Sequence, residues 1–135
     1  MTVVGFDCGL LHAHFRALNK RLNNDRFEFV FATVGETSGI PVPSKCNSDM
    51  HLPHLHRKNA PYSYEVPSLA LNDYIASRGL VPTHLKIDVD GAEFVVLKGA
   101  KKILGNAALP DIFIEIDHEN DGIFGFLEAC GFSVS

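Results

Sequence analysis

The sequence predicts an α/β domain with a mostly parallel sheet, and three observations lead to this class. Short apolar runs typical of buried strands alternate along the chain with segments of helical periodicity. The 135 residues suit one domain, and 46% hydrophobic with 21% charged residues is enough to bury a core. Three of the predicted strands also end on or beside an acid, where sites of parallel sheets lie.

The first half of the chain is predicted to contain two strands, a helix and a long loop. The valine-rich run 2–6 is typical of a buried strand, and the run 27–33 (FEFVFAT) predicts a second one. Between them, residues 10–22 predict an amphipathic helix, because apolar residues recur at intervals of three and four: Leu11, Phe15, Leu18 and Leu22. The interval 40–67 is rich in proline and has no sustained period, so we expect a long loop with room for a short strand.

The second half is predicted to alternate helices and strands. Ser68 is expected to cap a helix over 69–77, which Gly79 ends. Further strands are expected at 84–89 (HLKIDV) and 110–116 (PDIFIEI), and further helices at 91–104 and 122–129. Residues 132–135 resemble a strand that is cut short.

Composition excludes several functional classes. The formal net charge of −4 argues against a protein that grips nucleic acid. Cys8, Cys46 and Cys130 form no CxxC pair, which predicts neither a disulfide framework nor a cysteine zinc site and favours a reducing compartment. The first apolar run lacks a basic flank and stops at Asp7, so neither a signal peptide nor a transmembrane helix is predicted. We therefore expect a cytoplasmic protein with no nucleic-acid or membrane partner.

Carboxylates follow three of the predicted strands, namely Asp7, Asp88 and Glu115. One interpretation is helix capping, which suits the neighbouring Asp90 and Glu93. Carboxylates that converge with a histidine on one sheet edge exceed what capping requires. Such a cluster can hold ribose hydroxyls, a divalent cation or a hydroxyl that awaits deprotonation.

The run 85–100 (LKIDVDGAEFVVLKGA), followed by Ile103-Leu104 and by PDIFIE at 110–115, resembles the FkbM family of S-adenosylmethionine-dependent methyltransferases. Weaker similarity to that family extends upstream, through VGFD at 4–7 and FVFATVGE at 29–36. The resemblance covers nearly the whole chain and is weakest over 41–64. It implies a Rossmann-like class I fold and O-methylation of a hydroxyl on a sugar or secondary metabolite.

The resemblance also sets the register of the strands. A helix, a strand and a helix separate Asp7 from the strand that ends at Asp88, which is the spacing from second to fourth strand in a class I methyltransferase. The other register takes Asp7-Cys8-Gly9 as the first turn and requires an acid about twenty residues on, at the end of a strand that instead ends in Ala32-Thr33. We therefore expect a single partial domain over 1–135 without the glycine-rich first strand and the last strands, with 40–67 a long loop within it. The strands 2–6 and 84–89 would then either pair with each other or leave buried backbone unpaired.

In this register the resemblance implies a role for each site residue. Asp7 would bind the ribose hydroxyls of S-adenosylmethionine, with Thr33 beside the cofactor and Cys8 either touching it or serving as a small buried residue. Asp88 and Glu115 would lie beside the acceptor, where they hold a divalent cation or act with His118 as general base. The partner would be a small-molecule hydroxyl acceptor, and the oligomeric state is open.

Two alternatives remain. The motif HLPHLH contains His51, His54 and His56, whose spacing can hold a metal ion. We favour the interpretation that they are exposed loop side chains over a metal site. A non-catalytic α/β remnant that serves as an interaction module is the second functional class. The lack of a glycine-rich turn favours that class, whereas the intact acids favour the enzyme.

Overall fold

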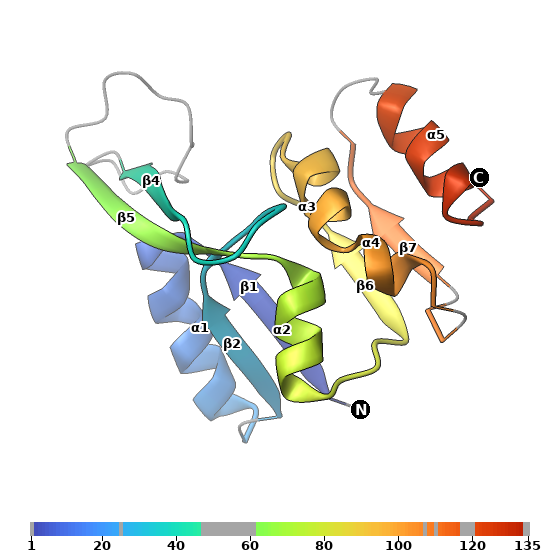
Figure 1. Ribbon diagram of the computed structural model, residues 1–135. Helices are drawn as coiled ribbons and strands as arrows, with labels where there is room; N and C mark the ends of the chain where they lie inside the picture. Colours follow the sequence, from blue (N-terminus) through green and yellow to red (C-terminus); the bar gives the residue numbers. More distant parts are fainter. Residues whose placement is uncertain are drawn as a thin grey trace. The chain divides into compact units, whose positions relative to one another are not determined.

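The computed structural model describes residues 2–24, 26–46, 62–106, 108–109, 111–116 and 121–133. Two compact units make up the chain (Figure 1). Unit 1 consists of Met1–Val34 and Gly39–Ser68, and unit 2 consists of Gly35–Ser38 and Leu69–Ser135. In the part of the chain that the structure describes, none of the helices is both long and apolar enough to cross a bilayer.

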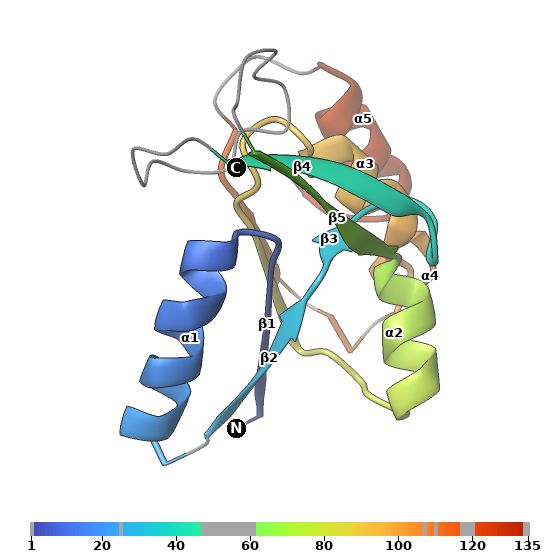
Figure 2. The same cartoon turned by 90° about the vertical axis from the view of Figure 1, so that its left-hand side faces the viewer.

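Unit 1 begins with a parallel strand–helix–strand motif. Strand β1 (Val3–Asp7) pairs in parallel with β2 (Phe27–Phe31), with Asp7 opposite Phe31. Helix α1 (Leu10–Leu22) connects the two strands and packs along β2 (Figure 2). The predicted strand, helix and strand are thus confirmed, although Phe15, Leu18 and Leu22 of the predicted apolar stripe are exposed.

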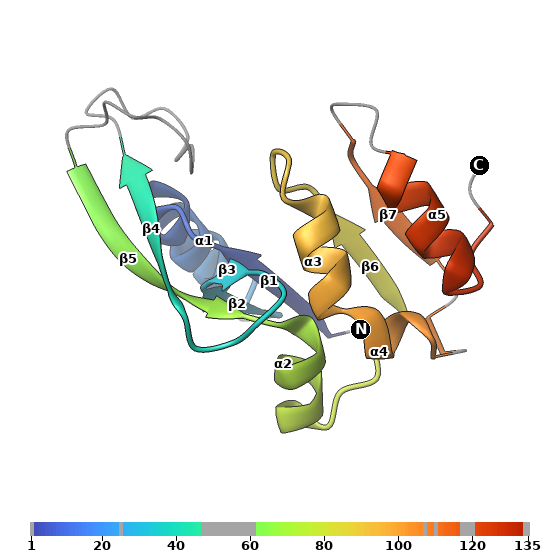
Figure 3. The same cartoon turned by 45° about the horizontal axis from the view of Figure 1, so that its top comes forward.

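The interval 40–67 was predicted to be a long loop because of its prolines, but strands form at both of its ends. Strands β4 (Pro41–Cys46) and β5 (Tyr62–Leu69) form an antiparallel pair there (Figure 3). Together with β3 (Thr33–Val34) they form a sheet of order β3-β5-β4. Pro41 and Pro43 lie on β4, at the edge of this sheet, where a missing amide hydrogen is tolerated, and Pro67 lies near the end of β5, opposite Pro41.

Helix α2 (Leu71–Arg78) opens unit 2, and its cap differs from the predicted one. The helix starts after Ala70, whose amide donates to Ser38 Oγ at 2.9 Å, and Ser38 Oγ donates to Asp73 Oδ2 at 2.6 Å. Ser68, the predicted cap, instead accepts from the amide of Ile40 at 2.9 Å. Gly79 ends the helix in the left-handed conformation (φ 60°), as predicted.

The rest of unit 2 builds a second parallel pair with helices on one side. Strand β6 (His84–Ile87) pairs with β7 (Asp111–Ile114) in a register that sets Ile87 opposite Ile114. The predicted helix 91–104 is two helices, α3 (Glu93–Gly99) and α4 (Lys101–Leu104), which meet at Ala100 (φ −103°, ψ 0°). Helix α5 (Asp121–Ala129) packs on α3, where the rings of Phe126 and Phe94 meet edge to face with their centroids 5.6 Å apart.

The described strands fall into three sheets, of which β1-β2 and β6-β7 are parallel. The prediction of mostly parallel pairing is confirmed for these two pairs, whereas β4 and β5 are antiparallel. Strands β1 and β6, whose direct pairing was one of two expected outcomes, belong to different sheets. The buried core of unit 2 comes mostly from the helices, with Ile87 of β6 and Leu109 added, and its helical members include Val96, Leu97, Ile103, Leu104, Ile123 and Leu127.

Candidate functional site

The turn after β1 presents the first predicted site residue, Asp7. Its Oδ1 accepts a hydrogen bond from the amide of Gly9 at 2.9 Å, and its backbone carbonyl accepts from the amide of Ala32 at 3.2 Å. The carboxylate therefore lies at the carboxyl end of a parallel strand pair, where the Gly9 amide holds one of its oxygens. Such strand ends are where α/β proteins bind ligands.

Two basic side chains of α1 contact the other oxygen of this carboxylate. Nδ1 of His12 lies 3.1 Å from Asp7 Oδ2, and Arg16 Nη2 lies 3.7 Å from the same atom. His12 and Arg16 are four positions apart, so they share one face of the helix. The Asp7 side chain is still 16% exposed, which leaves part of the carboxylate accessible.

Cys8 and Thr33 lie beside Asp7, so the structure brings the three predicted cofactor residues together. Burial raises the pKa of the Cys8 thiol, the Thr33 hydroxyl opposes this shift, and the charge of Asp7 adds to it. The thiol is therefore protonated and unreactive near neutral pH. Thr33 Oγ1 is buried and makes no well-oriented hydrogen bond with the described residues.

Tyr64 of β5 holds the same turn from another part of unit 1. Its hydroxyl donates to the carbonyl oxygen of Cys8 at 2.9 Å and accepts from the amide of Leu10 at 3.3 Å. Gly9, the N-cap of α1, has no side chain with which to cap the helix. The Tyr64 oxygen instead accepts from one of the free amides of the first helical turn, that of Leu10.

Asp88 and Glu115 follow the paired strands β6 and β7 in unit 2. The amide of Glu115 donates to the carbonyl oxygen of Ile87 at 3.0 Å, which continues the parallel register past the strand ends. Lys86 Nζ donates to Asp88 Oδ2 at 2.9 Å, and this bond, with the charges of Asp88 and Glu115, raises the pKa of Lys86. Both carboxylates are exposed, so unit 2 places two of the three predicted catalytic residues side by side. His118 lies outside the described residues.

The turn between β6 and α3 explains the predicted capping acids. Asp90 and Gly91 both have positive φ (50° and 95°), a conformation that aspartate and glycine tolerate best. Glu93 is buried, and its Oε1 accepts from the amide of Gly91 at 2.9 Å. Glu93 thus ties the turn to the helix as predicted, whereas α3 begins after Ala92 without a side-chain cap from Asp90.

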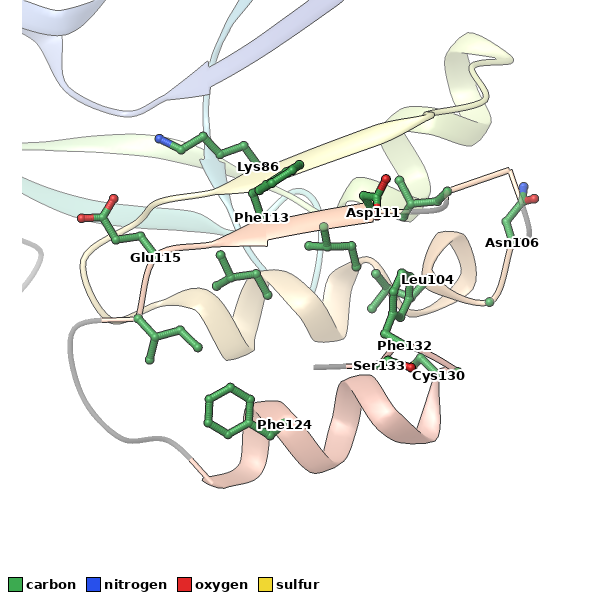
Figure 4. A pocket seen from close by; sticks show the side chains of 16 residues that line it. Lys86, Leu104, Asn106, Asp111, Phe113, Glu115, Phe124, Cys130, Phe132 and Ser133 are labelled. Atoms are coloured by element: carbon green, nitrogen blue, oxygen red, sulfur yellow. The ribbon is translucent and has the colours of Figure 1, made fainter. Parts of the chain in front are cut away.

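A cavity of about 1160 Å³ lies in unit 2 between β7 and α5 (Figure 4). Apolar side chains of both elements, such as Ile112, Ile114 and Phe124, line it. Figure 4 shows Phe124 on α5, while Lys86 and Phe113 stand on the opposite face of the β6-β7 pair. Of the predicted site residues that the structure describes, the cavity includes Glu115 alone, so we do not assign it to the acceptor.

Among the residues that the structure describes, no three or more histidine, cysteine, aspartate or glutamate side chains gather as a metal site would require. The histidines of the HLPHLH motif lie outside these residues.

The comparison with protein families decides which proteins this chain is related to. The model of the Methyltransferase FkbM domain matches residues 11–134, which is most of the chain. The chain belongs to the FkbM methyltransferase family. A comparison with curated proteins gives no match.

A solved structure agrees with this family at the level of the fold. The chain is similar to the crystal structure of methyltransferase FkbM from Methylobacillus flagellatus KT, with a TM-score of 0.55 and 18% sequence identity. The similarity covers 80% of this chain and 24% of that one, so the chain spans about a quarter of that protein's length.

Sequence reasoning missed three residues at the Asp7 turn of this FkbM-family chain. His12 and Arg16 were open to prediction, because two basic residues one helical turn apart follow a strand-end acid. Tyr64 gave no signal, since it reaches Cys8 from 56 positions away in the sequence.

Proposed function

We propose that the chain is an S-adenosylmethionine-dependent O-methyltransferase that acts on a hydroxyl of a sugar or secondary metabolite. The observation that carries the proposal is the Asp7 turn: a partly accessible carboxylate, fixed by backbone at the end of a parallel strand, in a chain of the FkbM family. In the register that the family resemblance implies, β1 and β6 correspond to the second and fourth strands of a Rossmann-like class I sheet.

The residues of the turn suit the ribose of the cofactor. Asp7 accepts from Gly9 through Oδ1 and from His12 through Oδ2, and a carboxylate offers about four acceptor sites in all. Two ribose hydroxyls can therefore donate to it through charge-assisted bonds. The Thr33 hydroxyl is buried beside the Cys8 thiol, so Thr33 belongs to the same turn.

The protonation state of Cys8 is compatible with this assignment. A thiolate beside a sulfonium would compete with the acceptor as nucleophile, because the thiolate is the reactive form of cysteine. Burial raises the pKa of Cys8 and so keeps the thiol neutral. A neutral thiol can line the cofactor without attacking it.

When bound, S-adenosylmethionine supplies a methyl group that is already activated on its sulfonium. The protein then has to align the acceptor hydroxyl, exclude water and receive a proton. We assign the proton to Asp88 or Glu115, which are exposed and adjacent, with His118 as the third candidate. Lys86 is paired with Asp88 and occupies one of its oxygens, and we derive no step through a metal ion.

We also propose a small hydroxyl-bearing molecule as the partner and the cytoplasm as the location. Cys8 and Cys130 are free thiols, as is usual in a reducing compartment.

The test is methyl transfer from S-adenosylmethionine labelled in its methyl group to a panel of sugars and hydroxylated metabolites. We expect the wild-type chain to transfer label to at least one acceptor and Asp88→Asn to lose about 100-fold in rate, since general base catalysis contributes on the order of that factor. Asp111→Asn is the matched control, because Asp111 is also exposed on the β6-β7 pair but lies at the opposite end of β7.

An Asp88→Asn variant that folds and methylates at the wild-type rate would exclude Asp88 as the base and leave Glu115 and His118 as the candidates. Failure of the wild-type chain to transfer label to any acceptor would favour the interaction module.

A further inference from the structure

The hydroxyl of Tyr64 bridges the two peptides that flank Gly9. It donates to Cys8 O at 2.9 Å and accepts from Leu10 N at 3.3 Å. Asp7 Oδ1 binds the Gly9 amide between these two contacts. Asp7 and Tyr64 therefore both hold the backbone of this turn: Asp7 binds the Gly9 amide, and Tyr64 binds the peptides on either side of Gly9.

The strand that carries Tyr64 is well anchored. Tyr64 lies on β5, the central strand of its sheet, directly opposite Ser44 of β4. Cross-strand partners share a face, and on this face Ser44 and Val66 are both 0% exposed. The Tyr64 side chain therefore projects from a buried face of the sheet, and its hydroxyl contacts the turn.

The position of the Asp7 partners depends on where α1 begins. His12 and Arg16 contact Asp7 Oδ2 from the first turns of this helix, and no side chain of Gly9 caps it. If the hydroxyl of Tyr64 is removed, the Leu10 amide and the Cys8 carbonyl lose their partner. The start of α1 can then shift relative to Asp7.

We propose that Tyr64 is a positioning residue for the cofactor: it orients the Cys8–Leu10 turn so that the Asp7 carboxylate faces the ribose hydroxyls. This role rests on the proposed function, since it takes Asp7 as the ribose-binding acid. Tyr64 acts through the turn and does not itself touch the reacting atoms.

The test compares calorimetric titrations of the full-length wild-type chain and Tyr64→Phe, using S-adenosylmethionine and its 2′,3′-dideoxy analogue. Tyr64→Phe keeps the ring and removes only the two hydrogen bonds, so we expect about tenfold weaker binding of S-adenosylmethionine. Binding of the dideoxy analogue should change less than about twofold, because that analogue offers Asp7 no hydroxyl. Tyr74→Phe is the matched control, since it removes a hydroxyl from a buried tyrosine of α2 in unit 2 and should leave both affinities unchanged.

A second variant removes the other side of the contact. Leu10→Pro deletes the amide that donates to Tyr64, at the first helical position, where proline is well tolerated. The preceding Gly9 has φ −80° and ψ 123°, which is the conformation that a residue before proline prefers. We expect about threefold weaker S-adenosylmethionine binding from the loss of this one bond.

The outcomes separate this role from the proposed function. Equal losses for S-adenosylmethionine and the dideoxy analogue in Tyr64→Phe would mean a general structural role and would overturn the proposal. Unchanged S-adenosylmethionine affinity in Tyr64→Phe overturns it as well and leaves the proposed function standing. A wild-type chain that binds neither ligand overturns both.

Discussion

Replacing Gly99 by alanine is expected to destabilise the chain, because the last residue of α3 packs directly on backbone. A Cβ at Gly99 would overlap the carbonyl oxygen of Gly35 and would lie 3.0 Å from Gly35 C and 3.3 Å from Glu36 Cα. These atoms belong to the main chain, and Gly35 is itself held by a 3.0 Å hydrogen bond from its amide to Leu69 O. The backbone therefore has to shift to make room.

Overpacking of this kind costs about 1–3 kcal/mol, and rigid neighbours place Gly99→Ala toward the upper end. Alanine recovers at most about 1 kcal/mol of helix propensity, and less at a helix end. We therefore expect a net loss of about 2 kcal/mol in the free energy of unfolding. For a domain of this size that corresponds to a fall of roughly 6–10 °C in Tm.

The assay is thermal unfolding followed by far-ultraviolet circular dichroism. Gly125→Ala is the matched control, because Gly125 lies inside α5 and an added Cβ there meets nothing within 4 Å. The same substitution should raise stability at that site by up to about 1 kcal/mol. If both Gly99→Ala and Gly125→Ala melt at or above the wild-type temperature, α3 does not pack as closely on Gly35 as the structure indicates.

The remaining predictions concern Cys8, whose pKa is raised mainly by burial. Its alkylation by iodoacetamide at pH 8 should be slower than in urea-unfolded chain, as followed by mass spectrometry of the Cys8 peptide; equal rates would contradict the buried, protonated thiol. Because the folded state favours the protonated thiol, the contribution of Cys8 to stability is fully present below the unfolded pKa and is lost as pH rises through the folded pKa. Denaturant unfolding between pH 8 and pH 10.5 should therefore show a steeper loss of stability for the wild-type chain than for Cys8→Ala, and parallel curves would refute the shift.

Local patterns were enough to predict the parts of the fold that local interactions build. The three-and-four spacing of apolar residues predicted α1, and Gly79 predicted the left-handed end of α2. Alternation of strands and helices predicted mostly parallel pairing, which β1-β2 and β6-β7 show, although the pairs themselves were not predicted. In each case the deciding residues lie within one element or at its end.

Features that depend on distant contacts were not predicted. The start of α2 is set by Ser38, which is 32 positions from Ala70, so the nearer Ser68 was a misleading signal. Proline in β4 indicated a loop, because the edge position that lets a strand tolerate it exists only in the assembled sheet.

The candidate site shows the same division. Asp7, Asp88 and Glu115 were predicted because strand-end acids are visible in the sequence. The partners of Asp7 on α1 needed the helix register, and Tyr64 needed the sheet that brings β5 to the turn.

Binding of S-adenosylmethionine by Asp7 is the central claim, and calorimetric titration into the full-length chain and Asp7→Asn tests it most directly. Asparagine keeps an oxygen for the Gly9 amide but loses the charge that strengthens bonds from the ribose hydroxyls. We predict saturable binding by the wild-type chain and at least about tenfold weaker binding by Asp7→Asn. No binding at millimolar S-adenosylmethionine, or equal binding by the two chains, would contradict the account.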